Sequence, residues 1–267
     1  MKTLRTPFLV AAVLSLLVGC TQTAPPTSRL ETMPRHDEWI DVASGERKVR
    51  TYVVHPQRSD RAPVVIVIHE NRGLTDWVRT VADQLAERGY LAIAPDFLSG
   101  MAPGGGGTSN FPTSDAAREA IGRLKPEQVM DDLRAVVQHA RSIPSASQSI
   151  SVAGFCWGGA KTWAAANSID GLKAAYVFYG TGPQDAAGVE SIEAPVYGFY
   201  GGDDARVNAT IPKTEELMKA AGKRFEPVIY EGAGHAFMRL GEAADSTPAN
   251  KKARDEAWSR WLGLLGK

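Results

Sequence analysis

The sequence has little cysteine and no surplus of charge of either sign. Its 267 residues include 2 cysteines, and 30 basic residues balance 30 acidic ones. The aromatic residues are dispersed and do not alternate with basic clusters, so we expect no nucleic-acid partner. No spaced pair of cysteines or histidines predicts a zinc site, and we expect neither a metal nor any other cofactor.

Long hydrophobic runs are also missing, and the apolar stretch 8–18 is too short for a comfortable membrane span. Lys2 and Arg5 precede this stretch and Leu-Val-Gly-Cys20 follows it, which is the pattern of a signal peptide. The last four residues resemble a bacterial lipobox, in which the cysteine is lipidated and becomes the first residue after cleavage. We therefore expect a lipoprotein signal peptide over residues 1–19 and a lipid-anchored flexible tether over 20–36. An ordinary secretory signal is the alternative.

The predicted lipid also determines where the protein should reside. Thr21 stands where an acidic residue would favour the inner membrane, so we expect the cell envelope of a bacterium and contact with the membrane through the lipid alone. A lipidated Cys20 leaves Cys156 without a disulfide partner. Such a thiol is either a catalytic nucleophile or an inert buried side chain.

Residues 37–267 show an alternation of strand and helix patterns that predicts one α/β domain. Continuous β-branched runs such as 63–68 are typical of strands buried on both faces of a parallel sheet. We predict a mostly parallel, doubly wound sheet with helices on both faces and a hairpin at one edge. The expected strands are 37–43, 48–55, 63–68, 91–94, 149–153, 172–179, 194–200 and 227–230. The expected helices lie around 78–85, 126–143, 160–167, 214–221 and 258–265.

The stretch around which this domain is organised is Gly-Phe-Cys156-Trp-Gly-Gly, between a predicted strand and a predicted helix. This is the context of a nucleophile elbow, G-x-S-x-G, with cysteine in place of serine. Gly154 and Gly158 leave room where strand and helix converge. The amide of Trp157 at the start of the helix is suited to a thiolate and to a developing oxyanion. A glycine-rich turn around a buried cysteine is the alternative.

Polar residues follow other predicted strands at the same edge of the sheet. Asp203 and Asp204 come after one strand and His235 after the next, so the chain order is nucleophile, acid, histidine, as in α/β-hydrolases. His235 is the expected base, but the spacing does not decide between the two aspartates. Glu70 follows the buried strand 63–68, where it either faces the same cleft or pairs with Arg72 on the surface.

Taken together, these motifs resemble the dienelactone hydrolases, also called carboxymethylenebutenolidases. The resemblance covers about residues 49–261 and lies in Glu70 with Gly73-Leu74, the elbow, Gly201-x-x-Asp204-x-x-Val207 and His235-Ala-Phe-x-Arg239. It implies an α/β-hydrolase fold, Asp204 as the triad acid, and an oxyanion hole formed by the amides of Trp157 and Asn71. It further implies that Glu70 holds the resting cysteine and helps to generate its thiolate, and that Arg239 binds a substrate carboxylate.

Some features depart from the family pattern and concern the substrate. A second arginine for a substrate carboxylate has no clear position, with Arg118 as one candidate, and Trp157 is bulkier than the usual aliphatic residue. We therefore expect a monomeric hydrolase of small-molecule esters or lactones, with a Cys156–Asp204–His235 triad and Trp157 contacting the substrate. A surface binding lipoprotein and a thiol-based redox protein are the alternatives. The glycine-containing loop 97–112 is expected either to cover the site or to be exposed to solvent.

Overall fold

The structure, a computed structural model, describes residues 29–266. The predicted signal peptide and the lipidation site Cys20 lie outside the described residues. Part of the segment predicted as a tether is structured, because α1 (Arg29–Thr32) is a short helix and Arg35 forms an ion pair of 2.6 Å with Asp83. None of the described helices combines the length and the apolar character needed to cross a membrane.

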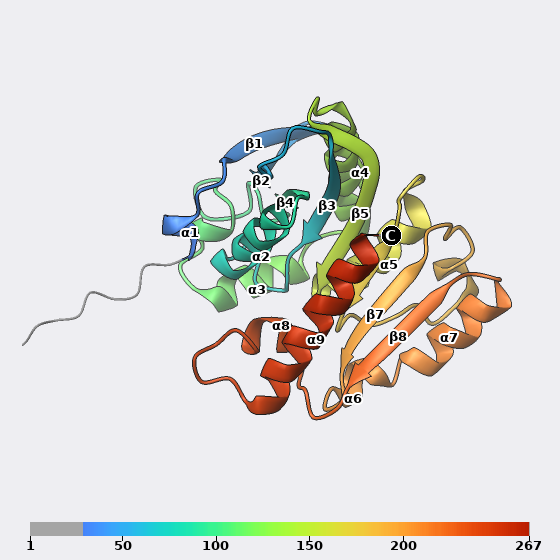
Figure 1. Ribbon diagram of the computed structural model, residues 1–267. Helices are drawn as coiled ribbons and strands as arrows, with labels where there is room; N and C mark the ends of the chain where they lie inside the picture. Colours follow the sequence, from blue (N-terminus) through green and yellow to red (C-terminus); the bar gives the residue numbers. More distant parts are fainter. Residues whose placement is uncertain (1–28, 267) are drawn as a thin grey trace, which may run out of the picture.

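The described chain forms one sheet with the strand order β1-β2-β4-β3-β5-β6-β7-β8 (Figure 1). β1 and β2 pair antiparallel as the predicted edge hairpin, β2 pairs antiparallel with β4, and all further pairs are parallel. This confirms the prediction of a mostly parallel sheet. The strands are β1 (Asp37–Ser44), β2 (Arg47–Val54), β3 (Ala62–Ile68), β4 (Leu91–Pro95), β5 (Ala146–Phe155), β6 (Ala175–Phe178), β7 (Val196–Gly201) and β8 (Phe225–Tyr230).

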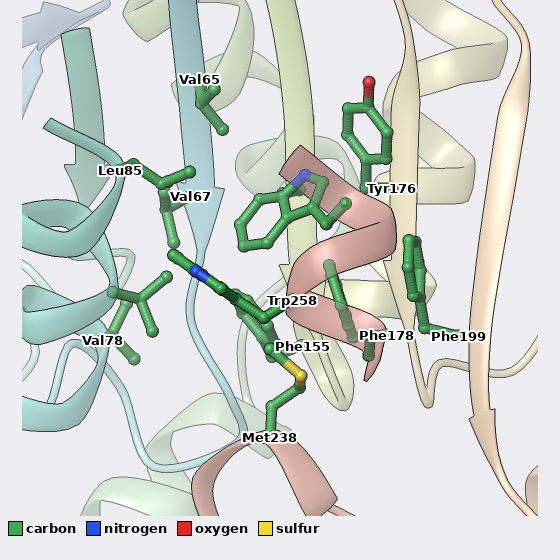
Figure 2. Close-up of a cluster of buried hydrophobic side chains, with 14 of the residues drawn as sticks. Val65, Val67, Val78, Leu85, Phe155, Tyr176, Phe178, Phe199, Met238 and Trp258 are labelled. Atoms are coloured by element: carbon green, nitrogen blue, oxygen red, sulfur yellow. The ribbon is translucent and has the colours of Figure 1, made fainter. Parts of the chain in front are cut away.

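Helices cover both faces of this sheet, as expected. Alternate residues of β3 point to opposite faces, so Val65 and Val67 pack with α2 and α9, whereas Ile66 and Ile68 pack on the side of α4 and α5. Figure 2 shows the first of these two clusters, in which aromatic side chains of β5, β6 and β7 meet residues of α8 and α9. The first face carries α2 (Asp76–Glu87), α8 (Phe237–Leu240) and α9 (Pro248–Leu265), and the second carries α4 (Pro126–Ser142), α5 (Trp157–Ser168) and α7 (Ile211–Ala220).

The region after β4 contains more structure than the sequence pattern indicated. The loop includes a 3₁₀ turn (Thr108–Asn110) and is followed by α3 (Ser114–Gly122), a helix that the analysis of the sequence did not predict. The Thr113 side chain caps α3 by accepting a hydrogen bond from the Ala116 amide. Its buried stripe is small, with one residue larger than alanine, Ile121, so the helical periodicity is weak.

A buried carboxylate ties this loop to the end of β4. Asp96, 3% exposed, accepts hydrogen bonds of 2.7 Å from both the amide and the hydroxyl of Thr108. The same hydroxyl accepts a hydrogen bond from the Leu74 amide. The loops that follow β3 and β4 are therefore joined through one threonine at the carboxyl edge of the sheet.

Candidate active site

The turn between β5 and α5 places Cys156 at the carboxyl edge of the sheet. Cys156 has φ 56° and ψ −112°, a backbone conformation that is strained for a residue with a side chain. A Cβ atom on Gly154 would lie 2.1 Å from the carbonyl oxygen of Gly158, and one on Gly158 would lie 2.4 Å from that of Ile68. The two glycines thus allow the close contact of strand and helix that the sequence pattern predicted.

Three side chains from three loops form a continuous hydrogen-bonded chain at this turn. Nε2 of His235 lies 3.0 Å from Sγ of Cys156, and Nδ1 of His235 lies 2.5 Å from Oδ2 of Asp204. Asp204 is 7% exposed, whereas Asp203 is exposed to solvent. The structure therefore brings Cys156, His235 and Asp204 together and leaves Asp203 outside the group.

The loops that carry Asp204 and His235 are held to each other by their backbones. The Asp203 amide donates a hydrogen bond of 2.9 Å to the Ala233 carbonyl, and the Gly202 amide donates one of 2.7 Å to the Tyr230 carbonyl. A Cβ atom on Gly201 would approach the Ala233 carbonyl oxygen to 2.5 Å. This close packing fixes the carboxylate relative to the imidazole.

The surroundings of His235 favour its protonated form. The hydrogen bond to Cys156, together with that to Asp204, raises the pKa of His235 from 6.5 to about 9, although burial acts in the opposite direction. At neutral pH the imidazole is therefore protonated when it faces the sulfur atom. An imidazolium in this position stabilises a thiolate.

Glu70 lies in the same cleft, but its contacts differ from those that the sequence suggested. One carboxylate oxygen lies 2.8 Å from Nε of Arg239 and the other accepts a 3.4 Å hydrogen bond from the Tyr179 hydroxyl. The surface pairing of Glu70 with Arg72, the alternative from the sequence, is absent. The hydrogen-bond partner of Cys156 is His235 and not Glu70.

Arg239 is charged in this environment and about one third exposed, with a side-chain exposure of 36%. Burial opposes its charge, but the neighbouring Glu70 carboxylate keeps the pKa of Arg239 above its ordinary value. The Glu70 side chain is only 8% exposed, and the guanidinium is its ion-pair partner. The pair forms one wall of the cleft.

Tyr179 is a residue of the site that the sequence analysis did not identify. It was expected to end the strand 172–179, but β6 ends at Phe178 because Tyr179 adopts φ 41°. Its ring contacts His235 edge to face, with centroids 5.2 Å apart. Burial and the nearby Glu70 charge raise the pKa of Tyr179, so its hydroxyl stays a hydrogen-bond donor. The signal in the sequence is its position, directly after an apolar strand and before Gly180.

His69 has a structural position beside Glu70 and is not free to hold a metal ion. Its Nδ1 lies 2.8 Å from the Glu70 carbonyl oxygen, and its Nε2 accepts a hydrogen bond of 3.3 Å from the Phe97 amide. Complete burial lowers the pKa of His69, so the ring is neutral. Trp157 stacks on this ring at 5.3 Å, with an angle of 12° between the planes. The indole therefore packs on the base of the site, and it is only partly exposed.

Two backbone amides near the carboxyl ends of β3 and β5 lack an acceptor in the described part of the chain. Trp157 is the first residue of α5, so its amide has no acceptor within the helix. Among residues 29–266, nothing accepts a hydrogen bond from the amides of Trp157 and Asn71. These are the two donors that the resemblance assigned to an oxyanion hole.

A cleft of about 460 Å³ opens beside the Glu70–Arg239 ion pair, a volume suited to a small molecule. Cys156 and His235 are not part of its lining. The loop after β4 contributes Thr108 and Ser109 to its wall, and α3 contributes Ser114. Arg118, the candidate for a second carboxylate-binding arginine, is exposed on α3 and is not part of the lining. The lining comprises Glu70, Arg72, Leu74, Thr75, Asp76, Trp77, Thr108, Ser109, Ser114 and Arg239.

A larger polar hollow of about 740 Å³ lies on the other side of the glycine-containing loop, next to Arg47, Lys48 and Arg50. Neither Glu70 nor Arg239 lines this hollow. Arg47 in this hollow is occupied by the Phe97 carbonyl oxygen and by Asp132. The smaller cleft, which Glu70 connects to His235 through Tyr179, is therefore the candidate active site.

Comparison with known proteins identifies the family of this chain. Residues 49–267 match the model of the dienelactone hydrolase family. A protein of Methylorubrum extorquens, whose name assigns it provisionally as a carboxymethylenebutenolidase, is 31% identical over 82% of this chain and 77% of its own length. A protein of Escherichia coli K12 with the same name is 32% identical over 79% of both chains.

Solved structures show the same architecture. A structure from Klebsiella pneumoniae, described provisionally as a dienelactone hydrolase, has a TM-score of 0.76 and 26% identity. The alignment covers 87% of this chain and 99% of the Klebsiella chain. With the sheet order described above, this similarity confirms the predicted α/β-hydrolase fold.

Proposed function

The chain belongs to the dienelactone hydrolase family, and from that premise we propose that it hydrolyses ester or lactone bonds through an acyl-thioester on Cys156. The observation that carries the proposal is the hydrogen-bonded chain from Cys156 Sγ through His235 to Asp204 at a strained elbow. A thiol, a base and a carboxylate in this order provide a nucleophile, a proton carrier and a group that orients it.

In the proposed acylation step, the Cys156 thiolate attacks the substrate carbonyl carbon and forms a tetrahedral intermediate. His235 has taken the thiol proton and delivers it to the leaving alkoxide as the carbon–oxygen bond breaks. Asp204 keeps Nδ1 of the imidazole protonated, so that Nε2 faces the reacting atoms. Water then attacks the thioester with His235 as base, and the acid product leaves with the thiol restored.

The negative oxygen of each tetrahedral intermediate is proposed to bind to the amides of Trp157 and Asn71. The support is that both amides lack an acceptor among the described residues, which leaves them free to donate hydrogen bonds to a developing oxyanion. Each such donor contributes about 3 kcal/mol to the lowering of the barrier. The backbone thus contributes as much as a catalytic side chain.

Arg239 is the proposed binding group for a carboxylate on the substrate, and Glu70 is proposed to assist formation of the thiolate. The support is their position, because the two side chains form an ion pair on the wall of the cleft and Arg239 remains partly exposed. A substrate carboxylate that binds Arg239 competes with Glu70 for the guanidinium. The substrate class is then a small anionic ester or lactone.

Intact-protein mass spectrometry after brief mixing with an activated ester tests the mechanism. We expect an acyl adduct on the wild type, no adduct on Cys156→Ala, and a persistent adduct on His235→Ala, which acylates slowly but cannot deacylate. Asp203→Asn is the matched control for Asp204→Asn, because only Asp204 contacts the histidine. If the folded protein with a reduced thiol gives neither adduct nor turnover, the hydrolase mechanism is ruled out. The alternative of a surface binding protein then remains.

We also propose that the mature chain is a monomer anchored in the bacterial cell envelope by lipid on Cys20, with the membrane contacted only through that lipid. The support is the sequence pattern alone, because Cys20 lies outside the described residues. Labelling with a fatty-acid analogue should mark the wild type and not Cys20→Ser. Size-exclusion chromatography with light scattering tests the monomer.

A further inference from the structure

Three side chains with metal-binding atoms meet at a place that the proposed reaction does not use. They are His36, Glu38 and His55, and their donor atoms all lie within 4.8 Å of one another. Nε2 of His55 lies 3.0 Å from Oε1 of Glu38, and the two imidazole rings have centroids 5.1 Å apart. Among the described residues, the side chain of His36 has no hydrogen-bond partner, so it is free to turn toward an ion.

The pairing of β1 with β2 brings these residues together. Asp37 lies opposite Val54, and at the next position the His55 amide donates a hydrogen bond of 2.9 Å to the His36 carbonyl. Glu38 is two residues after His36 and therefore points to the same face of β1. Facing residues of neighbouring strands have close Cβ atoms, so the hairpin presents two imidazoles and one carboxylate on one face.

Contacts on both sides of this group hold its backbone in place. Arg35, the residue before the group, is fixed by its ion pair with the fully buried side chain of Asp83. The other end is fixed by β2, which pairs with β4 through Val54 and Ala92. The backbone positions of the three ligands are therefore set before an ion binds, so only their side chains lose freedom on binding.

The group lies far from the active site in the topology of the sheet. β2 runs antiparallel to β4, so its last residue pairs near the start of β4, whereas the catalytic residues follow the carboxyl ends of the parallel strands. His36, Glu38 and His55 thus lie near the amino ends of the parallel strands, whereas Cys156 follows a carboxyl end. An ion bound there does not take part in ester hydrolysis.

We propose that His36, Glu38 and His55 form a Zn²⁺ site. Two imidazole nitrogens and one carboxylate oxygen are a common set of three protein ligands for zinc, with water in the fourth position. Ligand atoms about 2.1 Å from a tetrahedral zinc ion are about 3.4 Å apart, so small rotations of the three side chains close the site. The ion replaces the hydrogen bond between Glu38 and His55 and recruits the free imidazole of His36.

Binding of Zn²⁺ ties the beginning of β1 to the end of β2. β1 is at the edge of the sheet and follows directly on the segment predicted as the tether. A metal cross-link at this point resists unpairing of the edge strand, because an ion that binds only the paired strands stabilises them.

The test is calorimetric titration of the metal-free full chain with Zn²⁺. Cys156→Ser is used as the background, because the active-site thiol is itself a zinc ligand. His36→Ala, His55→Ala and Glu38→Gln are introduced into this background. His139→Ala, in α4 and outside the group, is the matched control. Thermal unfolding is followed in parallel with and without Zn²⁺.

We expect one Zn²⁺ per chain in the background protein and in His139→Ala, and a loss of affinity of at least about tenfold for each variant of the group. Zn²⁺ should raise the unfolding temperature only where the three ligands are intact. No binding, or binding that the His36 and His55 variants leave unchanged, overturns the proposal. With Cys156 present, His36→Ala should retain ester hydrolysis, so this test is independent of the proposed function.

Discussion

Replacing Gly158 with alanine separates two physical effects that act in opposite directions. Gly158 lies in the first turn of α5, where helix propensity alone favours alanine over glycine by about 1 kcal/mol. The added Cβ atom would, however, lie 2.4 Å from the Ile68 carbonyl oxygen and 2.5 Å from that of His69. Both atoms belong to the backbone at the end of β3, so they cannot rotate away as the end of a side chain would.

The steric cost of these contacts should exceed the free energy gained from helix propensity. Overpacking in a tightly packed interior destabilises by about 1–3 kcal/mol, and backbone obstacles place Gly158→Ala at the upper part of that range. After the gain of about 1 kcal/mol from helix propensity is subtracted, the net loss is about 2 kcal/mol, which lowers the Tm of a chain of this size by about 4–8 °C. The displaced helix also moves the Trp157 amide and Cys156, and a shift of about 1 Å reduces kcat by about 10²-fold.

Gly263→Ala is the matched control for this prediction. Gly263 also lies within a helix, α9, but a Cβ atom there would meet no other atom within 4 Å. Propensity then acts alone, and the variant should be more stable than the wild type by about 0.5–1 kcal/mol.

Thermal and urea unfolding of the three proteins, followed by circular dichroism, measures both effects. The expected order of Tm is Gly263→Ala, wild type, Gly158→Ala. If Gly158→Ala unfolds at or above the wild-type temperature and keeps its activity, then the close contact of α5 with β3 does not constrain the elbow. The reasoning about its geometry would then be refuted.

Three further predictions concern the side chains of the site. Asp204→Asn should lower kcat by up to about 10⁴-fold in ester hydrolysis assays, because the amide no longer fixes the imidazole tautomer, while Asp203→Asn should stay near the wild type. Arg239→Gln should destabilise by about 1–3 kcal/mol in urea unfolding, since Glu70 is left buried without its counter-charge; an unchanged midpoint would contradict this. The pKa of His235 is raised from 6.5 to about 9, so the folded chain holds an extra proton between these values. The stability that this histidine contributes is therefore complete below pH 6.5 and is lost as the pH rises to about 9. Unfolding of the wild type and of His235→Gln is measured at about pH 6 and about pH 10, and the free energy of unfolding should decrease more for the wild type.

Much of the fold could be predicted from the sequence, because its strands are buried on both faces. The run 63–68 is continuous in β-branched residues and corresponds to β3 almost to the residue. By contrast, α3 was missed because its buried stripe is mostly alanine and it follows a glycine-containing loop. Its place depends on Asp96 and Thr108, whose contact joins residues 12 positions apart and leaves no periodic pattern.

Several residues that the structure brings together had been singled out from the sequence, but Tyr179 and the contacts of Glu70 had not. Glycine spacing and chain order indicated Cys156 and His235, and the family pattern selected Asp204, which lies beside the histidine. The partner of Glu70 could not be read from the sequence. Arg72 is its near neighbour in the chain, whereas Arg239 is 169 positions away and meets it only through the fold. Tyr179 escaped notice for the same reason.

The backbone of Cys156 bears on what kind of protein this is. A side chain at φ 56° costs about 1–3 kcal/mol, which the rest of the fold must offset, whereas glycine adopts such angles freely. Cys156→Gly should therefore increase stability while it removes the thiol. A protein that used this fold only as a scaffold for binding would gain stability from Cys156→Gly and would lose no function. Under the proposed function, the strain serves to expose a reactive thiol at the end of a strand, and it sets a limit on the stability that such a chain can reach.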